Sequence, residues 1–224
     1  DIPWNDDAKG DKWKIHNKWK YPHMTPYDET IILDSDMIFT ESVDYWWDYL
    51  AKKDVWCCTN VKTFRNEDVT SDYYRKKFTQ LNLPNVYSNF TYFNKSELTF
   101  EFFRMVELIM THWNVYFDKF LAGVGQNWMS ADVAYALAIQ LLDIEAETCD
   151  YDIKDVPTFV HMKSMVQNVP ENMIESNWTK SITSELGDDL QVKIGNFTQT
   201  LPVHYVEKNW MDSNKIKQLE DAVL

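Results

Sequence analysis

The chain has 224 residues and a formal net charge of −13, because its 35 acidic side chains outnumber its 22 basic ones. Such an acidic chain is a poor match for a nucleic-acid backbone, which binds clustered Lys and Arg. A hydrophobic content of 45 %, including 15 % aromatic residues, is typical of a folded protein. We therefore expect one domain over residues 1–224, in which a metal ion or a local basic cluster is needed to bind phosphate.

The cysteines Cys57, Cys58 and Cys149 fit neither a disulfide framework nor a zinc-binding spacing. This usage is typical of a reducing compartment, so we expect a cytoplasmic protein. No apolar run approaches the roughly 18 residues that a membrane-spanning helix needs, so a membrane is not an expected partner.

Residues 1–28 form the only strongly basic segment of this acidic chain, with tryptophans placed among lysines that include Lys18. One interpretation is a solvated surface segment that tryptophans anchor to the domain. The other is a lid that faces the phosphates of a ligand. Pro26 and Asp28 are expected to turn the chain into the strand that follows.

Residues 30–38 are the stretch around which we expect the domain to be organised. Ile31, Ile32 and Leu33 run directly into Asp34 and Asp36. The apolar run predicts a strand of a parallel sheet that is buried on both faces. Buried carboxylates are costly unless they are paired or bind a cation, and open α/β sheets bind ligands at the carboxyl ends of their strands. The pattern therefore predicts a site for a divalent ion such as Mg²⁺ or Mn²⁺.

The remaining pattern alternates helices and strands, as in α/β domains. Apolar residues at helical spacing predict helices over 41–53, capped by Thr40, over 97–121, capped by Ser96, and over 131–142, starting at Ser130. A short helix near 73–81 and a polar helix starting at Asp212 or Ser213 are also expected. Strands are predicted over 55–64, 87–93, 156–162, 190–194 and 201–206, and the second of these is predicted to be half-buried.

An apolar strand followed by Asp-x-Asp is compatible with three interpretations. In haloacid-dehalogenase-type phosphatases the first Asp is a nucleophile, but that class favours Thr or Val where Ile38 stands. It also needs an acidic pair after a later buried strand, and residues 183–186 before Asp188 and Asp189 do not have that pattern. In GT-A glycosyltransferases the pair holds the metal ion and ribose of a sugar nucleotide. In the third interpretation both aspartates only cap a turn.

The stretch from Pro26 to Asp36 resembles the glycosyltransferase-type proteins that tailed phages encode, which are similar to GT-A sugar-nucleotide transferases. The likeness continues through residues 13–14, 18, 93–96 and 161–163 and ends in 193–196 and 204–209. It implies an α/β fold of GT-A type with a mixed, mainly parallel central sheet flanked by helices. Fewer residues precede Asp34 than a nucleotide-binding half needs, so that N-terminal half is expected to be truncated.

The resemblance also assigns a metal site and a phosphate site. It implies that Asp34 binds the metal ion or the ribose, and that Asp36 and His204 bind the metal ion. Imidazole among carboxylates suits Mn²⁺ better than Mg²⁺. Lys208 would neutralise the departing diphosphate, and Lys18 would contact phosphate. A solvated surface position is the alternative for Lys208.

Further residues receive roles on the substrates. Asp132 would face the reacting sugars as a base or an orienting group, although an acid in the first turn of a helix is stabilised by the helix dipole alone. Asn94 would bind a sugar hydroxyl, or it is simply a turn residue. His161 and Lys163 flank one apolar position of a strand, so both would project to one face and complete an acceptor or phosphate pocket.

The predicted function is therefore a metal-dependent, hexosyltransferase-like glycosyltransferase that uses a nucleotide-diphosphate sugar as its donor. The acceptor class stays open between a glycan, a protein and a modified base. The alternative from another class is a non-catalytic, phage-encoded binding or virion-associated domain that keeps the fold. A phosphatase of the haloacid-dehalogenase type is the lesser alternative.

Overall fold

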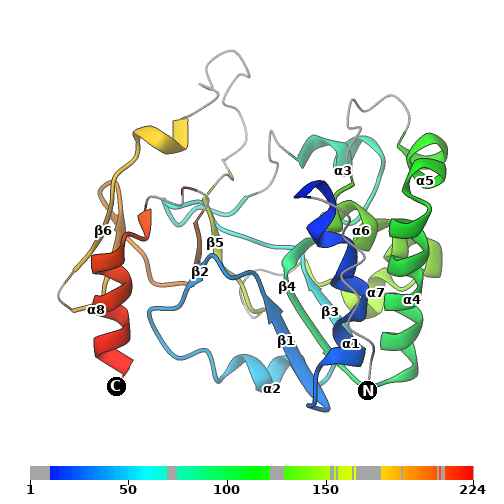
Figure 1. The fold of residues 1–224 in the computed structure, drawn as a ribbon, viewed down its shortest axis with the longest axis horizontal. Helices are drawn as coiled ribbons and strands as arrows, with labels where there is room; N and C mark the ends of the chain where they lie inside the picture. The colour runs from blue at the N-terminus through cyan, green and yellow to red at the C-terminus, as the bar shows by residue number, and fades with distance from the viewer. Residues whose placement is uncertain are drawn as a thin grey trace. The chain divides into compact units, whose positions relative to one another are not determined.

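The computed structural model describes residues 11–69, 75–121, 129–151, 154, 156–162, 164, 178–187, 189–205, 207 and 210–223. These residues form a mixed α/β structure of helices and small sheets (Figure 1). The chain divides into two compact units. The first unit comprises Asp1–Leu33, Trp46–Thr59 and Arg75–Tyr151, and the second comprises Asp34–Tyr45, Asn60–Tyr74 and Asp152–Leu224. The expectation that the whole chain is one domain stays a prediction.

The first unit contains most of the helices and one sheet. Its strands are β1 (Glu29–Leu33), β3 (Val55–Cys58) and β4 (Tyr87–Asn94). Its helices are η1 (Asp11–Lys20), α1 (Tyr21–Met24), α2 (Trp46–Leu50), α3 (Lys76–Gln80), α4 (Glu97–Thr111), α5 (Trp113–Phe120), α6 (Ala131–Leu142) and α7 (Glu145–Thr148).

The sheet of the first unit has the order β1–β4–β3, and both pairings are antiparallel. The prediction of a parallel strand that is buried on both faces is therefore wrong for β1, which lies at the edge of the sheet and is exposed at Glu29 and Leu33. The buried central strand is β4 instead. Its prediction as half-buried is also wrong, because every residue from Tyr87 to Phe93 is buried.

The core of the first unit lies between the sheet and the pair α4 and α6, which lie side by side (Figure 1). Phe102 and Phe103 of α4 both meet Tyr135 of α6 edge to face, with ring centroids 5.2 Å and 6.0 Å apart. Ser96 caps α4 as predicted, because its Oγ accepts a hydrogen bond from the Thr99 N–H at 3.2 Å. The alanines of α6 let it approach its neighbours closely, and its sequence-predicted bounds are confirmed.

Several predicted elements differ in length from the observed ones. The helix predicted over 41–53 is shortened to α2, and the strand over 55–64 is shortened to β3. The helix predicted through residue 121 is interrupted at His112, which separates α4 from α5. Ser130 precedes α6, but its side chain makes no capping hydrogen bond. The basic N-terminal segment forms helical turns from Asp11 to Met24, which the sequence did not predict.

The described residues of the second unit form short strands and helical segments. The strands are β2 (Met37–Ile38), β5 (Val160–His161), β6 (Ser184–Leu186), β7 (Val192–Ile194), β8 (Phe197–Thr198) and β9 (Val203–His204). The helical segments are η4 (Trp178–Ser181) and α8 (Ser213–Val223). Asp212 caps α8, since its Oδ1 accepts hydrogen bonds from the backbone N–H groups of Asn214 and Lys215, both at 3.0 Å.

The described strands of this unit form three-stranded sheets with the orders β2–β9–β5 and β6–β7–β8. Among the described strands only β5 and β9 pair in parallel, so the predicted mainly parallel central sheet is not confirmed. Within the described part of the chain, no helix has both the length and the apolar character needed to span a bilayer.

The β2–β9–β5 sheet presents an apolar face and an imidazole-bearing face. Register places Ile38, Val203 and Val160 in one row across the sheet, and all three belong to the core of this unit. The next row is Met37, His204 and His161. Because successive residues of a strand point to opposite faces, the two imidazoles lie together on the face turned away from that core.

Candidate metal centre

Asp34, Asp36 and His204, which the resemblance implies as metal ligands, lie close together in the second unit. One ligand atom from each lies within 4.8 Å of the others. His204 Nε2 and Asp36 Oδ1 are 3.1 Å apart. Ligand atoms that share one divalent ion lie no farther apart than about twice a bond of 2.0–2.6 Å, so the three side chains fit a common ion.

Backbone pairing holds the two carboxylates next to the imidazole. The chain leaves β1 at Leu33, makes a turn through Asp34 and Asp36, and enters β2 at Met37. Met37 is the register partner of His204, and the Tyr205 N–H donates to the Asp36 carbonyl oxygen at 3.0 Å. The antiparallel ladder therefore fixes Asp36 against β9, although a long stretch of sequence separates them.

The centre is shielded but remains open to a ligand. The His204 side chain is 13 % exposed and that of Asp36 is 21 % exposed. Like charges on Asp34 and Asp36 repel at this separation, and either a protonated imidazole or a divalent cation would relieve that repulsion. Two carboxylates and one imidazole are ligands that divalent ions accept in proteins.

A second imidazole lies beside the group. The His161 ring centroid is 5.2 Å from that of His204, and the planes are inclined by 36°. Nδ1 of His161 lies 2.9 Å from the hydroxyl of Ser164, which is itself buried. Phe159 packs edge-on against both imidazoles, with centroids 6.3 Å from His161 and 6.2 Å from His204.

The other predicted site residues fall elsewhere. Lys18, Asn94 and Asp132 belong to the first unit, whereas the Asp34–Asp36–His204 group belongs to the second. Lys163 and Lys208 lie outside the described residues. The phosphate-binding roles of Lys18, Lys163 and Lys208 stay predictions.

Asn94 supports the backbone at the end of β4. Its side-chain Nδ2 donates to the Lys53 carbonyl oxygen at 3.3 Å and to Asp54 Oδ1 at 2.9 Å. These contacts join β4 to the loop before β3, so the geometry favours the turn-residue interpretation. Its contact with a sugar hydroxyl stays a prediction.

Asp132, in the first turn of α6, is held by a dense set of donors. Its Oδ2 lies 2.6 Å from Arg75 Nη1, and its Oδ1 accepts hydrogen bonds from the Ser88 N–H at 2.9 Å and the Ser88 hydroxyl at 2.6 Å. Burial alone raises the pKa of Asp132, but the Arg75 guanidinium and the Ser88 hydrogen bonds outweigh burial and lower the pKa to about 2. A carboxylate this acidic is a weak base near neutral pH. The contacts of Asp132 are those of a structural ion pair, and its catalytic role stays a prediction.

Asp132 should make the stability of the protein depend on acid pH. Its pKa is lower in the folded state than in the unfolded chain, where it is near 4, so its contribution is complete above about pH 4 and disappears as the pH falls toward 2. We expect the difference in unfolding free energy between wild type and Asp132→Asn to shrink by about 2 kcal/mol between about pH 7 and about pH 2.5. Urea unfolding of both proteins at each pH measures it. An equal difference at both pH values would contradict the ion pair.

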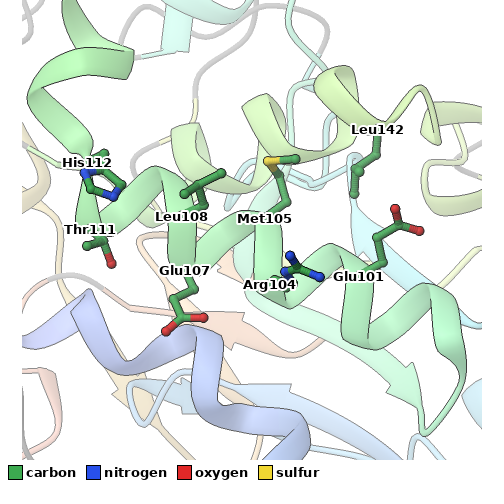
Figure 2. Close-up of a pocket in the computed structure, with 8 residues that line it drawn as sticks. All are labelled: Glu101, Arg104, Met105, Glu107, Leu108, Thr111, His112 and Leu142. Atoms are coloured by element: carbon green, nitrogen blue, oxygen red, sulfur yellow. The ribbon is translucent and has the colours of Figure 1, made fainter.

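A hollow of about 490 Å³ lies on the first unit (Figure 2). Its lining comes from α4, the residue that follows α4, and the end of α6. Figure 2 shows Glu101, Arg104 and Glu107 along α4. The other lining residues are Met105, Leu108, Thr111, His112 and Leu142. None of the residues to which the sequence assigned a role lines this hollow.

Sequence reasoning missed several residues around the Asp34–Asp36–His204 group and around Asp132. Nothing in the sequence singles out Ser164 as the partner of His161, or Phe159 as the ring beside both imidazoles. Nor does the sequence indicate which basic residue reaches Asp132. The spacing of His161 and Ser164 is the only local signal, and many unrelated His and Ser residues share it.

No protein-family model, no curated protein and no solved structure matches this chain.

Proposed function

We propose that the protein is a metal-dependent glycosyltransferase that moves a sugar from a nucleotide-diphosphate donor to an acceptor. The observation that supports this proposal is the grouping of Asp34, Asp36 and His204 within 4.8 Å. These are the residues that the resemblance to GT-A transferases marks as metal ligands, and they come from opposite ends of the chain. The GT-A-type fold remains part of the proposal, and the parallel pairing of β5 with β9 is the part of the described sheets that agrees with it.

The proposed centre would act on the leaving group. A divalent ion held by Asp34, Asp36 and His204 would stabilise the negative charge that develops on the diphosphate as the bond to the sugar breaks. The ion would also overcome the repulsion between an acidic protein and a diphosphate. No chemical step of the proposal depends on Asp132, because its carboxylate is already paired with Arg75 and Ser88.

The function is tested by incubating the full chain with a panel of sugar nucleotides and Mn²⁺ and measuring release of the nucleoside diphosphate. We expect release from one donor or a few, loss of release with a chelator, and loss in Asp36→Asn. A panel without any release would contradict the proposal. Turnover of a generic phosphomonoester instead would favour the phosphatase interpretation.

A non-catalytic binding domain is the second candidate. The observation that favours it is that Asp132, the residue predicted to serve as a base, is already paired with Arg75 Nη1 at 2.6 Å and with the Ser88 hydroxyl at 2.6 Å. Such a domain would bind Mn²⁺ and a nucleoside diphosphate without turning over any sugar nucleotide. Thermal stabilisation by Mn²⁺ and a uridine or guanosine diphosphate, together with an inactive panel, would identify it.

A further inference from the structure

We propose that His161 is a fourth ligand of the same metal centre, so that the ion is bound by two imidazoles and two carboxylates. The inference depends on the metal centre of the proposed function, but not on any sugar transfer. It rests on strand register, on the separation of the two imidazole rings, and on the contact between His161 and Ser164.

Register places the His161 side chain on the face where the centre lies. β5 and β9 run in parallel, and His161 is the register partner of His204. Register partners project to the same face of a sheet. The residues one position earlier, Val160 and Val203, form the opposite face and are buried in the core, so neither histidine is needed to fill that core.

The two rings lie close enough together for both to reach one ion once the His161 ring turns. With metal–nitrogen bonds of about 2.0–2.1 Å, two imidazoles at adjacent positions around an ion have centroids roughly 4.5–5.3 Å apart. The observed centroids are 5.2 Å apart. His161 is not among the residues whose ligand atoms lie within 4.8 Å of one another, so its coordination requires the ring to move when the ion binds.

Ser164 orients His161 in the way that a partner orients a ligating histidine. A metal-bound histidine commonly donates the N–H of its other ring nitrogen to a nearby acceptor, which fixes its tautomer and its orientation. Nδ1 of His161 lies 2.9 Å from the Ser164 hydroxyl, and the Ser164 N–H donates to the His161 carbonyl oxygen at 3.0 Å. The contact assigns Nδ1 to Ser164 and makes Nε2 the ligand atom of His161.

The consequence is selectivity among ions. Two nitrogens and two carboxylate oxygens favour Mn²⁺, Fe²⁺, Co²⁺ or Zn²⁺ over Mg²⁺ and Ca²⁺, which prefer oxygen. A centre that used only His204 would discriminate less strongly. We therefore expect Mn²⁺ to bind in the presence of a large excess of Mg²⁺.

The test is pulsed EPR of the wild-type chain loaded with Mn²⁺ alone, which counts coordinated imidazoles through the modulation from their nitrogens. We expect two imidazoles in the wild type, one in His161→Phe, one in His204→Phe and none in the double variant. His112→Phe, which changes an exposed histidine of the first unit, is the control and should retain two. Affinity for Mn²⁺ should fall about tenfold or more in His161→Phe.

Two outcomes would overturn the inference, and they differ from each other. Mn²⁺ bound by the wild type through one imidazole, with no change in His161→Phe, would refute the fourth ligand and leave the three-residue centre standing. No Mn²⁺ bound at all would refute the centre and this inference together. His161→Gln, which retains a hydrogen-bonding side chain, replaces the Phe variant if circular dichroism shows that Phe disturbs the fold.

Discussion

Replacing Arg75 with methionine is expected to lower the free energy of unfolding by about 2–4 kcal/mol, the largest loss we expect from one polar substitution. Arg75 is 9 % exposed and its guanidinium has a partner at each nitrogen. Nε donates to Asn85 Oδ1 at 2.7 Å, Nη1 donates to Asp132 Oδ2 at 2.6 Å, and Nη2 donates to the Val86 carbonyl oxygen. Without Arg75, the largely buried Asp132 carboxylate loses its cation and the Val86 carbonyl oxygen loses this hydrogen-bond donor.

Aromatic rings add to the effect of Arg75. Its guanidinium carbon lies 3.8 Å from the ring centroid of Tyr87 and 4.4 Å from that of Phe78, so the planar cation is stacked as well as hydrogen-bonded. Lysine cannot reproduce this geometry, and Arg75→Lys should also be destabilising.

Urea unfolding measures the loss in Arg75→Met, and Arg104→Met is the matched control because Arg104 is exposed on α4. The control should stay within about 0.5 kcal/mol of wild type. In the Arg75→Met/Asp132→Asn double variant, the loss should be smaller than the sum of the single losses, since the stranded charge is gone. Strictly additive losses would contradict the pairing.

Replacing Asp36 with asparagine is expected to weaken Mn²⁺ binding by about 100-fold or more, because it removes a charged ligand in contact with His204. The metal-free variant should be about as stable as wild type, since the substitution also relieves the repulsion between Asp34 and Asp36. The expected signature is therefore the loss of thermal stabilisation by Mn²⁺ with little change in the melting temperature without metal.

Asp44→Asn is the control for Asp36→Asn. Asp44 is exposed, lies in the same segment Asp34–Tyr45 of the second unit, and involves the same change of charge. It should keep the full stabilisation by Mn²⁺. Equal responses of the two variants would mean that Mn²⁺ acts through net charge, and the proposed centre would be wrong.

The long, strongly periodic segments were predictable from sequence. β4, the start of α4 and both ends of α6 agree with the pattern because many residues report the same period, and because Ser96 marks a helix start chemically. Short elements were less predictable. Thr40 and the acids after it resemble a helix start, yet only Trp46–Leu50 is helical.

The direction and burial of strands depend on partners that lie far away in the sequence. The apolar run over residues 31–33 is compatible with a parallel or an antiparallel sheet. Only its pairing with β4 decides between the two directions. Two polar residues of β4 are buried with partners inside the fold: Ser88 donates to Asp132, and Thr91 donates to the Ser88 carbonyl oxygen at 3.5 Å. The alternation of polar and aromatic residues along the sequence of β4 could not indicate such partners.

The same limit applies to the candidate site. Asp34 and Asp36 are visible locally, because two acids after an apolar run need a cation or a turn. His204 was singled out by resemblance, and its position beside Asp36 depends on the pairing of β2 with β9. An acid in the first turn of a helix is favoured by the helix dipole alone, so the position of Asp132 did not indicate its pairing with Arg75. Its role could therefore not be inferred from position alone.

The most direct test of the proposed metal site is a titration of the wild-type chain with Mn²⁺, in which the EPR signal of the free ion is measured. We expect one equivalent of Mn²⁺ to be withdrawn from that signal, and we expect Asp36→Asn and His204→Phe to withdraw much less of it at the same concentrations of chain and ion. A wild-type chain that leaves the free Mn²⁺ signal unchanged would contradict the central claim that Asp34, Asp36 and His204 form a metal site.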